Sequence, residues 1–94
     1  MRIDYHKRFL KQYEKLLPKI KSKFNERLKI FIANPLSPEL SNHPLHGEYL
    51  GYRSINITGD LRAVYEVQGE AIKFLFIDTH SNLYKKKHEN FKHN

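Results

Sequence analysis

Apolar residues recur at helical spacing in the first third of the chain. They fall every three or four positions in two stretches, first at Phe9, Tyr13 and Leu16 and then at Ile20, Phe24, Leu28 and Phe31. Pro18 separates the two stretches, because the residue before a proline is disfavoured in helical geometry. The pattern predicts a short strand at residues 2–5 followed by two amphipathic helices. We expect these helices to form a basic hairpin over one side of a core.

The second half of the chain changes to a period of two. Apolar and aromatic residues alternate with polar ones, at Ile55, Ile57, Leu61, Ala63, Tyr65 and Val67. This alternation predicts a β-hairpin that turns near residues 59–60. The apolar positions are odd on both strands, and a two-residue loop would put them on opposite faces. A three-residue loop, Thr58-Gly59-Asp60, or a bulge is therefore expected.

A third strand, Ala71 to Asp78, follows a turn at Gly69-Glu70, and its apolar residues on both faces predict a more central place in the sheet. Phe74 and Phe76 are expected to pack against the helices. The predicted fold class is α+β, with an N-terminal helical hairpin packed on one face of a small antiparallel β-sheet. The other face is expected to stay open and polar, with Ser54, Asn56, Arg62, Val64 and Glu66 on it and with Asn56 and Arg62 as cross-strand neighbours.

Length and composition narrow the class of protein. A chain of 94 residues predicts one domain, residues 1–94. The absence of cysteine excludes disulfides and thiolate metal sites. The longest apolar run, residues 72–77, is too short for a membrane span and contains Lys73. A cytoplasmic protein without a membrane partner is the expectation.

The net charge of +7 is unevenly distributed. Residues 1–34 hold ten Lys and Arg against three acids, residues 35–84 hold three against six, and the tail, residues 85–94, holds four against one. Basic surfaces of this kind attract phosphate backbones and acidic protein partners. A lysine-rich, solvated helix surface explains the same charge equally well.

Several residues of the predicted sheet have the chemistry of a phosphodiester site. Cleaving RNA without a metal needs one group to take the 2′-hydroxyl proton, one to protonate the leaving oxygen, and cations for the phosphate. His80, at a strand end, suits either proton role, and Arg62 suits the phosphate because its planar fork binds two oxygens. Each also has a structural explanation: His80 as a strand cap, Arg62 as a surface ion pair with Glu66 or Asp60, and Tyr84 as a packed ring.

A metal site is the weaker alternative. His43 and His46 are three residues apart and His80 could supply a third nitrogen, as in catalytic zinc sites. The first two flank Pro44 in a loop and do not share a helix face. No metal and no cofactor is therefore expected.

The stretch "HPLHGEYLGYRSINITGDLRAVYE" followed by "FLFIDTHSNLY" resembles the RelE/ParE superfamily of bacterial toxins, and most closely its YafQ-like messenger-RNA interferases. The resemblance covers residues 43–84 and depends on His-Pro-Leu, Gly-Tyr-Arg and Thr-His-Ser in this order. It implies a ribosome-dependent, metal-independent endoribonuclease that a cognate antitoxin inhibits. His43, Asp60 and His80 match active-site positions of YafQ-like toxins, and Tyr84 matches the aromatic residue of their nucleotide pocket.

Two positions depart from the YafQ-like pattern. Arg62 matches an arginine of RelE that contacts the scissile phosphate, where YafQ-like chains usually carry an apolar residue. Asn56 stands where YafQ-like toxins usually carry a histidine and RelE a lysine. Because asparagine cannot exchange a proton near neutral pH, the proton transfers would fall to His80 and His43.

The leading hypothesis is thus a toxin of a type II toxin–antitoxin system that cleaves messenger RNA on the ribosome. The residues assigned to catalysis are His80, His43, Asp60, Arg62 and Tyr84, and those assigned to substrate binding are Arg53, Asn56, Lys85, Lys86 and Lys87. The expected partners are a cognate antitoxin, ribosomal RNA and messenger RNA. Two alternatives stay open: a non-enzymatic, ParE-like toxin that binds gyrase, and a ribosome- or nucleic-acid-binding module without toxicity.

Overall fold

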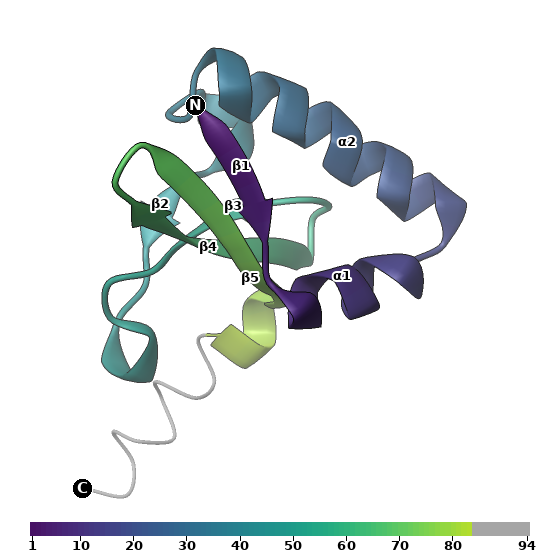
Figure 1. Ribbon diagram of the computed structural model, residues 1–94. Helices are drawn as coiled ribbons and strands as arrows, with labels where there is room; N and C mark the ends of the chain where they lie inside the picture. Colours follow the sequence, from purple (N-terminus) through teal and green to yellow (C-terminus); the bar gives the residue numbers. More distant parts are fainter. Residues whose placement is uncertain (84–94) are drawn as a thin grey trace, which may run out of the picture.

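The computed structural model describes residues 1–83 and contains a five-stranded sheet with two helices (Figure 1). The elements, in chain order, are β1 (Arg2–Tyr5), α1 (Lys7–Glu14), α2 (Pro18–Ala33), the 3₁₀ turn η1 (Pro38–Leu40), β2 (His43–Pro44), the 3₁₀ turn η2 (Gly47–Tyr49), β3 (Arg53–Asn56), β4 (Leu61–Gln68) and β5 (Ala71–Thr79). The strand order is β1-β5-β4-β3-β2. β1 runs parallel to β5, and the other pairs are antiparallel.

The α+β class and the strand at residues 2–5 are confirmed, and two pairings go beyond the predicted three-stranded sheet. β1 adds a parallel edge strand, and His43–Pro44 pairs with β3 at the opposite edge. The predicted three-residue loop is confirmed: Asn56 lies opposite Arg62 and Ile55 opposite Ala63, which leaves residues 58–60 in the turn. This register places the apolar residues of both strands on one face.

Helix α1 is fixed to the sheet where β1 ends. The side-chain amide of Gln12 donates from Nε2 to the carbonyl of Ile77 at 2.9 Å and accepts from the amide of Ile77 at Oε1 at 2.7 Å. It therefore bonds the N–H and the C=O of Ile77, which the backbone of a longer β1 would otherwise do. This contact joins residues 65 positions apart in the chain and holds the end of β5 that precedes His80.

The core lies between the helices and one face of the sheet. Phe9 from α1 and Phe24 and Phe31 from α2 surround the buried ring of Phe74, with centroid distances of 5.4 to 5.8 Å. The odd-numbered hairpin residues Ile55, Ile57, Ala63 and Tyr65 complete this cluster, as the alternation predicts. Val67, at the far end of β4, is 60% exposed, so the prediction fails at that position.

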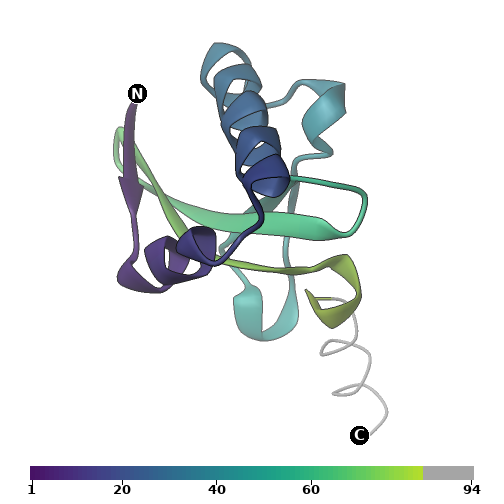
Figure 2. The same ribbon diagram turned by 90° about the vertical axis from the view of Figure 1, so that its right-hand side faces the viewer.

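The hairpin arrangement of the two helices is not confirmed. Pro18 occupies the first position of α2, where its missing N–H is harmless, so the predicted break between the helices is correct. The helices contact one another through aromatic rings, such as Phe9 and Phe24 at 5.2 Å, and few backbone positions of the two come close. Figures 1 and 2 show them as separate segments at different parts of the sheet.

A β-bulge in β5 overturns one prediction about the core. Tyr65 lies opposite Phe74 and Val64 opposite Phe76, so Leu75 is an extra residue with no partner of its own. The extra residue shifts the alternation by one position. Phe74 consequently faces the helices, whereas Phe76 faces away from them and belongs to a second cluster with Leu45, Val64 and Leu83.

The face of the sheet turned away from the helices is covered rather than open. Ser54, Arg62 and Val64 are all buried, and Arg62 is only 5% exposed. The segment after β2 folds over this face and contributes Leu45, Tyr49 and Tyr52, and Leu83 packs there from the end of the described chain. Figure 2 shows this teal segment on the side of the sheet opposite α2. The period-two pattern could not reveal this cover, because it is formed by a loop.

Candidate functional site

The site begins at β2, the two-residue strand that holds His43. Its pairing with β3 puts His43 opposite Ser54, and Nδ1 of its imidazole lies 2.8 Å from the carbonyl oxygen of Ser41. A carbonyl oxygen only accepts hydrogen bonds, so Nδ1 must carry the proton. In the neutral ring Nε2 then carries the lone pair, which is the form that a general base requires.

Arg62 lies on β4, and its side chain reaches Ser41, which shortly precedes β2 in the chain. Its Nε donates to Oγ of Ser54 at 2.7 Å, and its Nη2 donates to the carbonyls of Ser41 at 2.6 Å and of Ser54 at 3.1 Å. Ser41 therefore accepts from both Arg62 and His43. The expectation of a surface ion pair with Glu66 or Asp60 is wrong, because the guanidinium is buried and directed at Ser54 and Ser41.

The surroundings of His43 lower its pKa below the ordinary value of 6.5. Partial burial is the largest cause, since it disfavours the charged ring. The hydrogen bond to Ser41 acts in the opposite direction, and the nearby charges of Arg62, His80 and Arg53 lower the pKa further. His43 is therefore mainly neutral at pH 7.

His80 follows directly on β5 and opens a helical turn at residues 80–83. Its backbone amide donates to the carbonyl of Asp60 at 2.7 Å, so the strand end is tied to the β3–β4 turn. The hydroxyl of Thr79 accepts from the amide of Asn82 at 3.0 Å and caps the helical turn. The imidazole of His80 is exposed and its charge acts on His43, so the structure brings these two predicted residues to one site.

The predicted residues Asp60, Arg53 and Asn56 occupy different positions around this centre. Asp60 is exposed in the turn that anchors His80. Arg53 lies opposite Tyr65, on the helix side of the sheet, and its Nε donates to Asn42 at 2.9 Å. Strand alternation thus separates the side chain of Arg53 from that of Arg62. Asn56 lies beside Arg62, and its Oδ1 is buried without a hydrogen-bond partner among the described residues.

Four predicted site residues, Tyr84, Lys85, Lys86 and Lys87, lie outside the described residues. In turn, Ser41 and Ser54 hold the site together and were not predicted. Ser54 was expected only as a polar residue of an open face. Ser41 adopts the left-handed conformation, with φ of 46°, and nothing in the pattern around it signals that its carbonyl would be shared.

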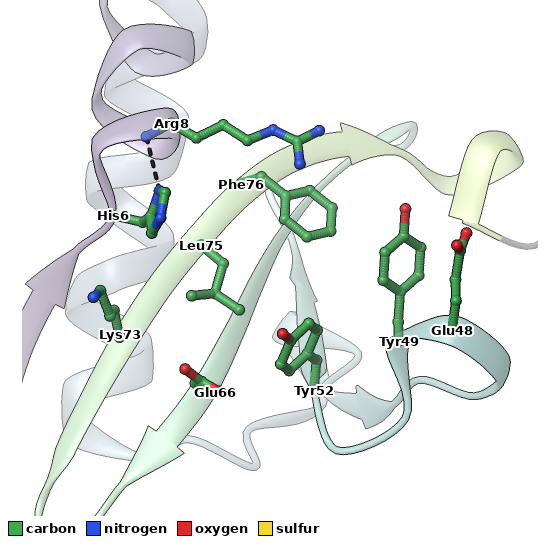
Figure 3. A pocket seen from close by; sticks show the side chains of 9 residues that line it. All are labelled: His6, Arg8, Glu48, Tyr49, Tyr52, Glu66, Lys73, Leu75 and Phe76. Carbon is green, nitrogen blue, oxygen red and sulfur yellow. Dashed lines mark hydrogen bonds between the residues drawn. The ribbon is translucent and has the colours of Figure 1, made fainter.

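A cavity of about 400 Å³ lies elsewhere on the covered face of the sheet. Figure 3 shows its floor of Leu75 and Phe76 with Tyr49 and Tyr52 beside it, and the guanidinium of Arg8 lies over the ring of Phe76 at 4.5 Å from its centroid. The remaining lining residues are His6, Glu48, Glu66 and Lys73. The cationic and acidic side chains nearly balance, so the cavity has no marked preference for an anion.

Within residues 1–83, no group of three or more His, Cys, Asp or Glu side chains is placed to hold a metal ion. No helix of the described part is long and apolar enough to cross a membrane.

Comparison with known proteins assigns the chain to a protein family. A sequence model described as "Bacterial toxin of type II toxin-antitoxin system, YafQ" matches residues 1–85. The chain belongs to the YafQ toxin family. It is thus a toxin of a type II toxin–antitoxin system, as the resemblance in residues 43–84 implied. No curated protein sequence matches it.

Solved structures agree with the YafQ assignment. The structure of YafQ from E. coli strain BL21(DE3) is similar with a TM-score of 0.69 and 26% identity, over 89% of this chain and 99% of that one. A copper-bound mutant toxin from Helicobacter pylori is similar with a TM-score of 0.71 and 30% identity, over 88% and 98%. YafQ in the E. coli DinJ–YafQ complex is similar with a TM-score of 0.63 and 26% identity, over 89% and 99%.

Proposed function

We propose that this YafQ-family toxin is an endoribonuclease that cleaves messenger RNA on the ribosome by acid–base catalysis. Toxins of this family are messenger-RNA endoribonucleases, which supports the assignment. The observation that carries the proposal for this chain is the hydrogen bond from Nδ1 of His43 to the carbonyl of Ser41, which makes Nε2 the proton-accepting nitrogen. The charge of His80 lowers the pKa of this ring, so the two histidines lie near one another.

In the proposed reaction, Nε2 of His43 takes the proton of the 2′-hydroxyl. The 2′-oxygen attacks the adjacent phosphorus, the bond to the 5′-oxygen breaks, and a 2′,3′-cyclic phosphate forms. Protonated His80 gives its proton to the departing 5′-oxygen. Proton transfers of this kind typically contribute 10²- to 10⁴-fold each to the rate, and neither step requires a metal ion.

Negative charge on the pentavalent phosphate needs cationic surroundings. The buried charge of Arg62 acts on this region through the low-dielectric interior, as its effect on the pKa of His43 indicates. Asp60 would orient His80 by way of the shared turn, since its carbonyl receives the amide of His80. Tyr84 as a pocket wall, Arg53 and Asn56 as substrate contacts, and Lys85 to Lys87 as a phosphate grip remain proposals from the sequence.

The proposed partners are a cognate antitoxin and the translating ribosome, in a cytoplasmic setting. The antitoxin is supported by the solved DinJ–YafQ complexes of E. coli, whose YafQ chains resemble this one. The ribosome is supported by the ten Lys and Arg of residues 1–34, which suit ribosomal RNA. Apparent activity should then fall as salt rises.

The proposal is tested by mapping 5′ ends of messenger RNA in a translating extract with the parent protein, His80→Ala and His43→Ala. We expect discrete cleavage by the parent and a loss of about 100-fold or more in both variants. Gln68→Ala serves as the control, since Gln68 is exposed and uncharged and its side chain bonds Glu66 on the same strand. Intact messenger RNA with the parent would refute the proposal, and toxicity with DNA damage that survives His80→Ala would instead indicate a gyrase-binding toxin.

A further inference from the structure

We infer that Arg62 is a positioning residue, which holds the Ser41 carbonyl against Nδ1 of His43 and so fixes the imidazole tautomer, rather than a ligand of the scissile phosphate. This inference rests on the proposed function, because it assigns the role of His43 that Arg62 serves. It also separates this chain from the RelE-like role that the sequence suggested for the same position.

The first support is where the guanidinium points. Arg62 is 5% exposed, and its Nε and Nη2 donate to Ser54 and Ser41 at 2.6 to 3.1 Å. A phosphate at Nε or Nη2 would have to replace hydrogen bonds that these nitrogens already make to Ser54 and Ser41, and breaking such bonds in a buried site is costly. The geometry therefore favours a guanidinium that holds Ser54 and Ser41 in place over one that contacts substrate.

The second support is the carbonyl of Ser41. It has two lone pairs, and it accepts from Nη2 of Arg62 at 2.6 Å and from Nδ1 of His43 at 2.8 Å. Ser41 reaches this position only in the left-handed conformation, at φ 46° and ψ 47°, which is unfavourable for a residue with a Cβ. The hydrogen bond from Arg62 offsets this cost and keeps the carbonyl turned toward His43.

The third support is that the contacts form a closed frame. His43 lies opposite Ser54 across the β2–β3 pair, and Ser54 accepts from Arg62 through both its hydroxyl and its carbonyl. On the helix side, Asn42 donates to the carbonyl of Pro35 and to the hydroxyl of Tyr65, each at 2.8 Å. Asn42 thus holds the loop to one side of the sheet, and Arg62 fixes Ser41 on the other.

Three charged groups on neighbouring elements lower the pKa of His43 through their charges. They are Arg62 on β4, Arg53 on β3 and His80 after β5. Removing the Arg62 charge and losing the Ser41 hydrogen bond would act on the pKa of His43 in opposite directions. The tautomer of His43, unlike its pKa, reports the frame alone.

The decisive measurement is the ¹⁵N NMR spectrum of the histidine side chains above pH 8, in the parent, Arg62→Lys, Arg62→Met and Arg2→Met. We expect His43 to be the Nδ1–H tautomer in the parent and in Arg2→Met. In both Arg62 variants it should shift toward the Nε2–H form that an unconstrained imidazole favours. Lysine retains the charge but cannot reproduce the fork, so Arg62→Lys tests geometry alone. An Nε2–H tautomer in the parent, or an unchanged tautomer in the folded variants, would overturn the inference.

Single-turnover cleavage on programmed ribosomes supplies a second readout. A positioning role predicts a maximal rate about 10- to 100-fold lower in Arg62→Lys, with a half-saturating toxin concentration within about twofold of the parent. The slope of log affinity against log salt should be the same in Arg62→Met as in the parent. A slope smaller by about one in Arg62→Met than in the parent would show a phosphate contact and refute the positioning role.

The two experiments separate the failure of this inference from the failure of the proposed function. If the parent cleaves no RNA but shows the Nδ1–H tautomer and its dependence on Arg62, the frame exists and the proposed catalysis is wrong. If the parent cleaves RNA and the tautomer does not depend on Arg62, the catalysis stands and the positioning role is wrong.

Discussion

Gln12 provides the sharpest test of how helix α1 supports the site. Its side-chain amide makes two hydrogen bonds to the backbone of Ile77, at 2.9 and 2.7 Å, where β1 has ended and β5 continues toward His80. Gln12→Ala removes both bonds and leaves one amide and one carbonyl of β5 without these partners. Each bond contributes about 0.5 to 1.5 kcal/mol net, and each partly buried group left unsatisfied costs about 1 to 3 kcal/mol.

These contributions overlap, because the loss of a bond and the exposure of its partner describe the same event. We therefore expect Gln12→Ala to lower the free energy of unfolding by about 2 to 3 kcal/mol, with water reaching part of the freed backbone. For a domain of this size that corresponds to a Tm lower by roughly 10 to 20 °C. A loss of this size is a large share of the about 5 to 15 kcal/mol that stabilises a typical domain.

The assay is urea unfolding followed by circular dichroism, with Gln68→Ala as the matched control. Gln68 is an exposed glutamine whose side-chain amide bonds Glu66 on the same strand, so its replacement should change stability by less than about 0.5 kcal/mol. Hydrogen exchange should show the amide of Ile77 exchanging faster in Gln12→Ala. A destabilisation no larger than that of Gln68→Ala would refute the idea that Gln12 substitutes for a strand.

Three further predictions concern the site. Because burial lowers the pKa of His43, the acidic limb of the cleavage rate against pH should have its midpoint below 6.5. The unfolded chain should then bind the proton more tightly than the folded one, so the stabilising contribution of neutral His43 should be lost as pH falls below about 6.5. A midpoint above 6.5 in an NMR titration of His43 would contradict both expectations. Ser41→Val should lower the unfolding free energy by about 1 to 2 kcal/mol, because a β-branched residue resists φ of 46°, whereas Ser41→Gly should stay within about 0.5 kcal/mol in the same denaturation assay. Asn56→Ala should cost less than about 1 kcal/mol of stability in that assay, because Oδ1 of Asn56 has no described partner to lose; a larger loss would reveal a partner.

The periodicities of the sequence predicted the parts of the fold that depend on local patterning. The two helical stripes and the β-hairpin follow from where apolar residues fall, and the odd parity predicted either the three-residue loop that is observed or a bulge. Phe76 shows the limit of this reasoning. A single extra residue, Leu75, inverted the facing of the strand beyond it, and a bulge has no reliable signal in the pattern of apolar positions.

The candidate site was likewise predictable from the sequence only in part. Motifs in the sequence indicated His43, His80 and Arg62 as site residues, and the structure brings them together at one end of the sheet. The role of Arg62 could not be read from its neighbours along the strand, because Ser41 is 21 residues away and its carbonyl has no side-chain identity. Sequence also could not show that a loop and Leu83 cover the face on which Arg62 lies.

The sequence by itself determined which residue types were available and which strand or helix would hold them, because hydrophobic periodicity selects secondary structure before any long-range contact forms. Only the tertiary structure decided which groups are buried, which donors meet which acceptors, and which nitrogen of His43 carries the proton. These depend on backbone carbonyls and on contacts between distant segments, and a buried polar group must be paired wherever the chain brings it. In this toxin the buried guanidinium of Arg62 therefore donates hydrogen bonds to Ser41 and Ser54. The Ser41 carbonyl also accepts from Nδ1 of His43, which leaves Nε2 as the candidate base.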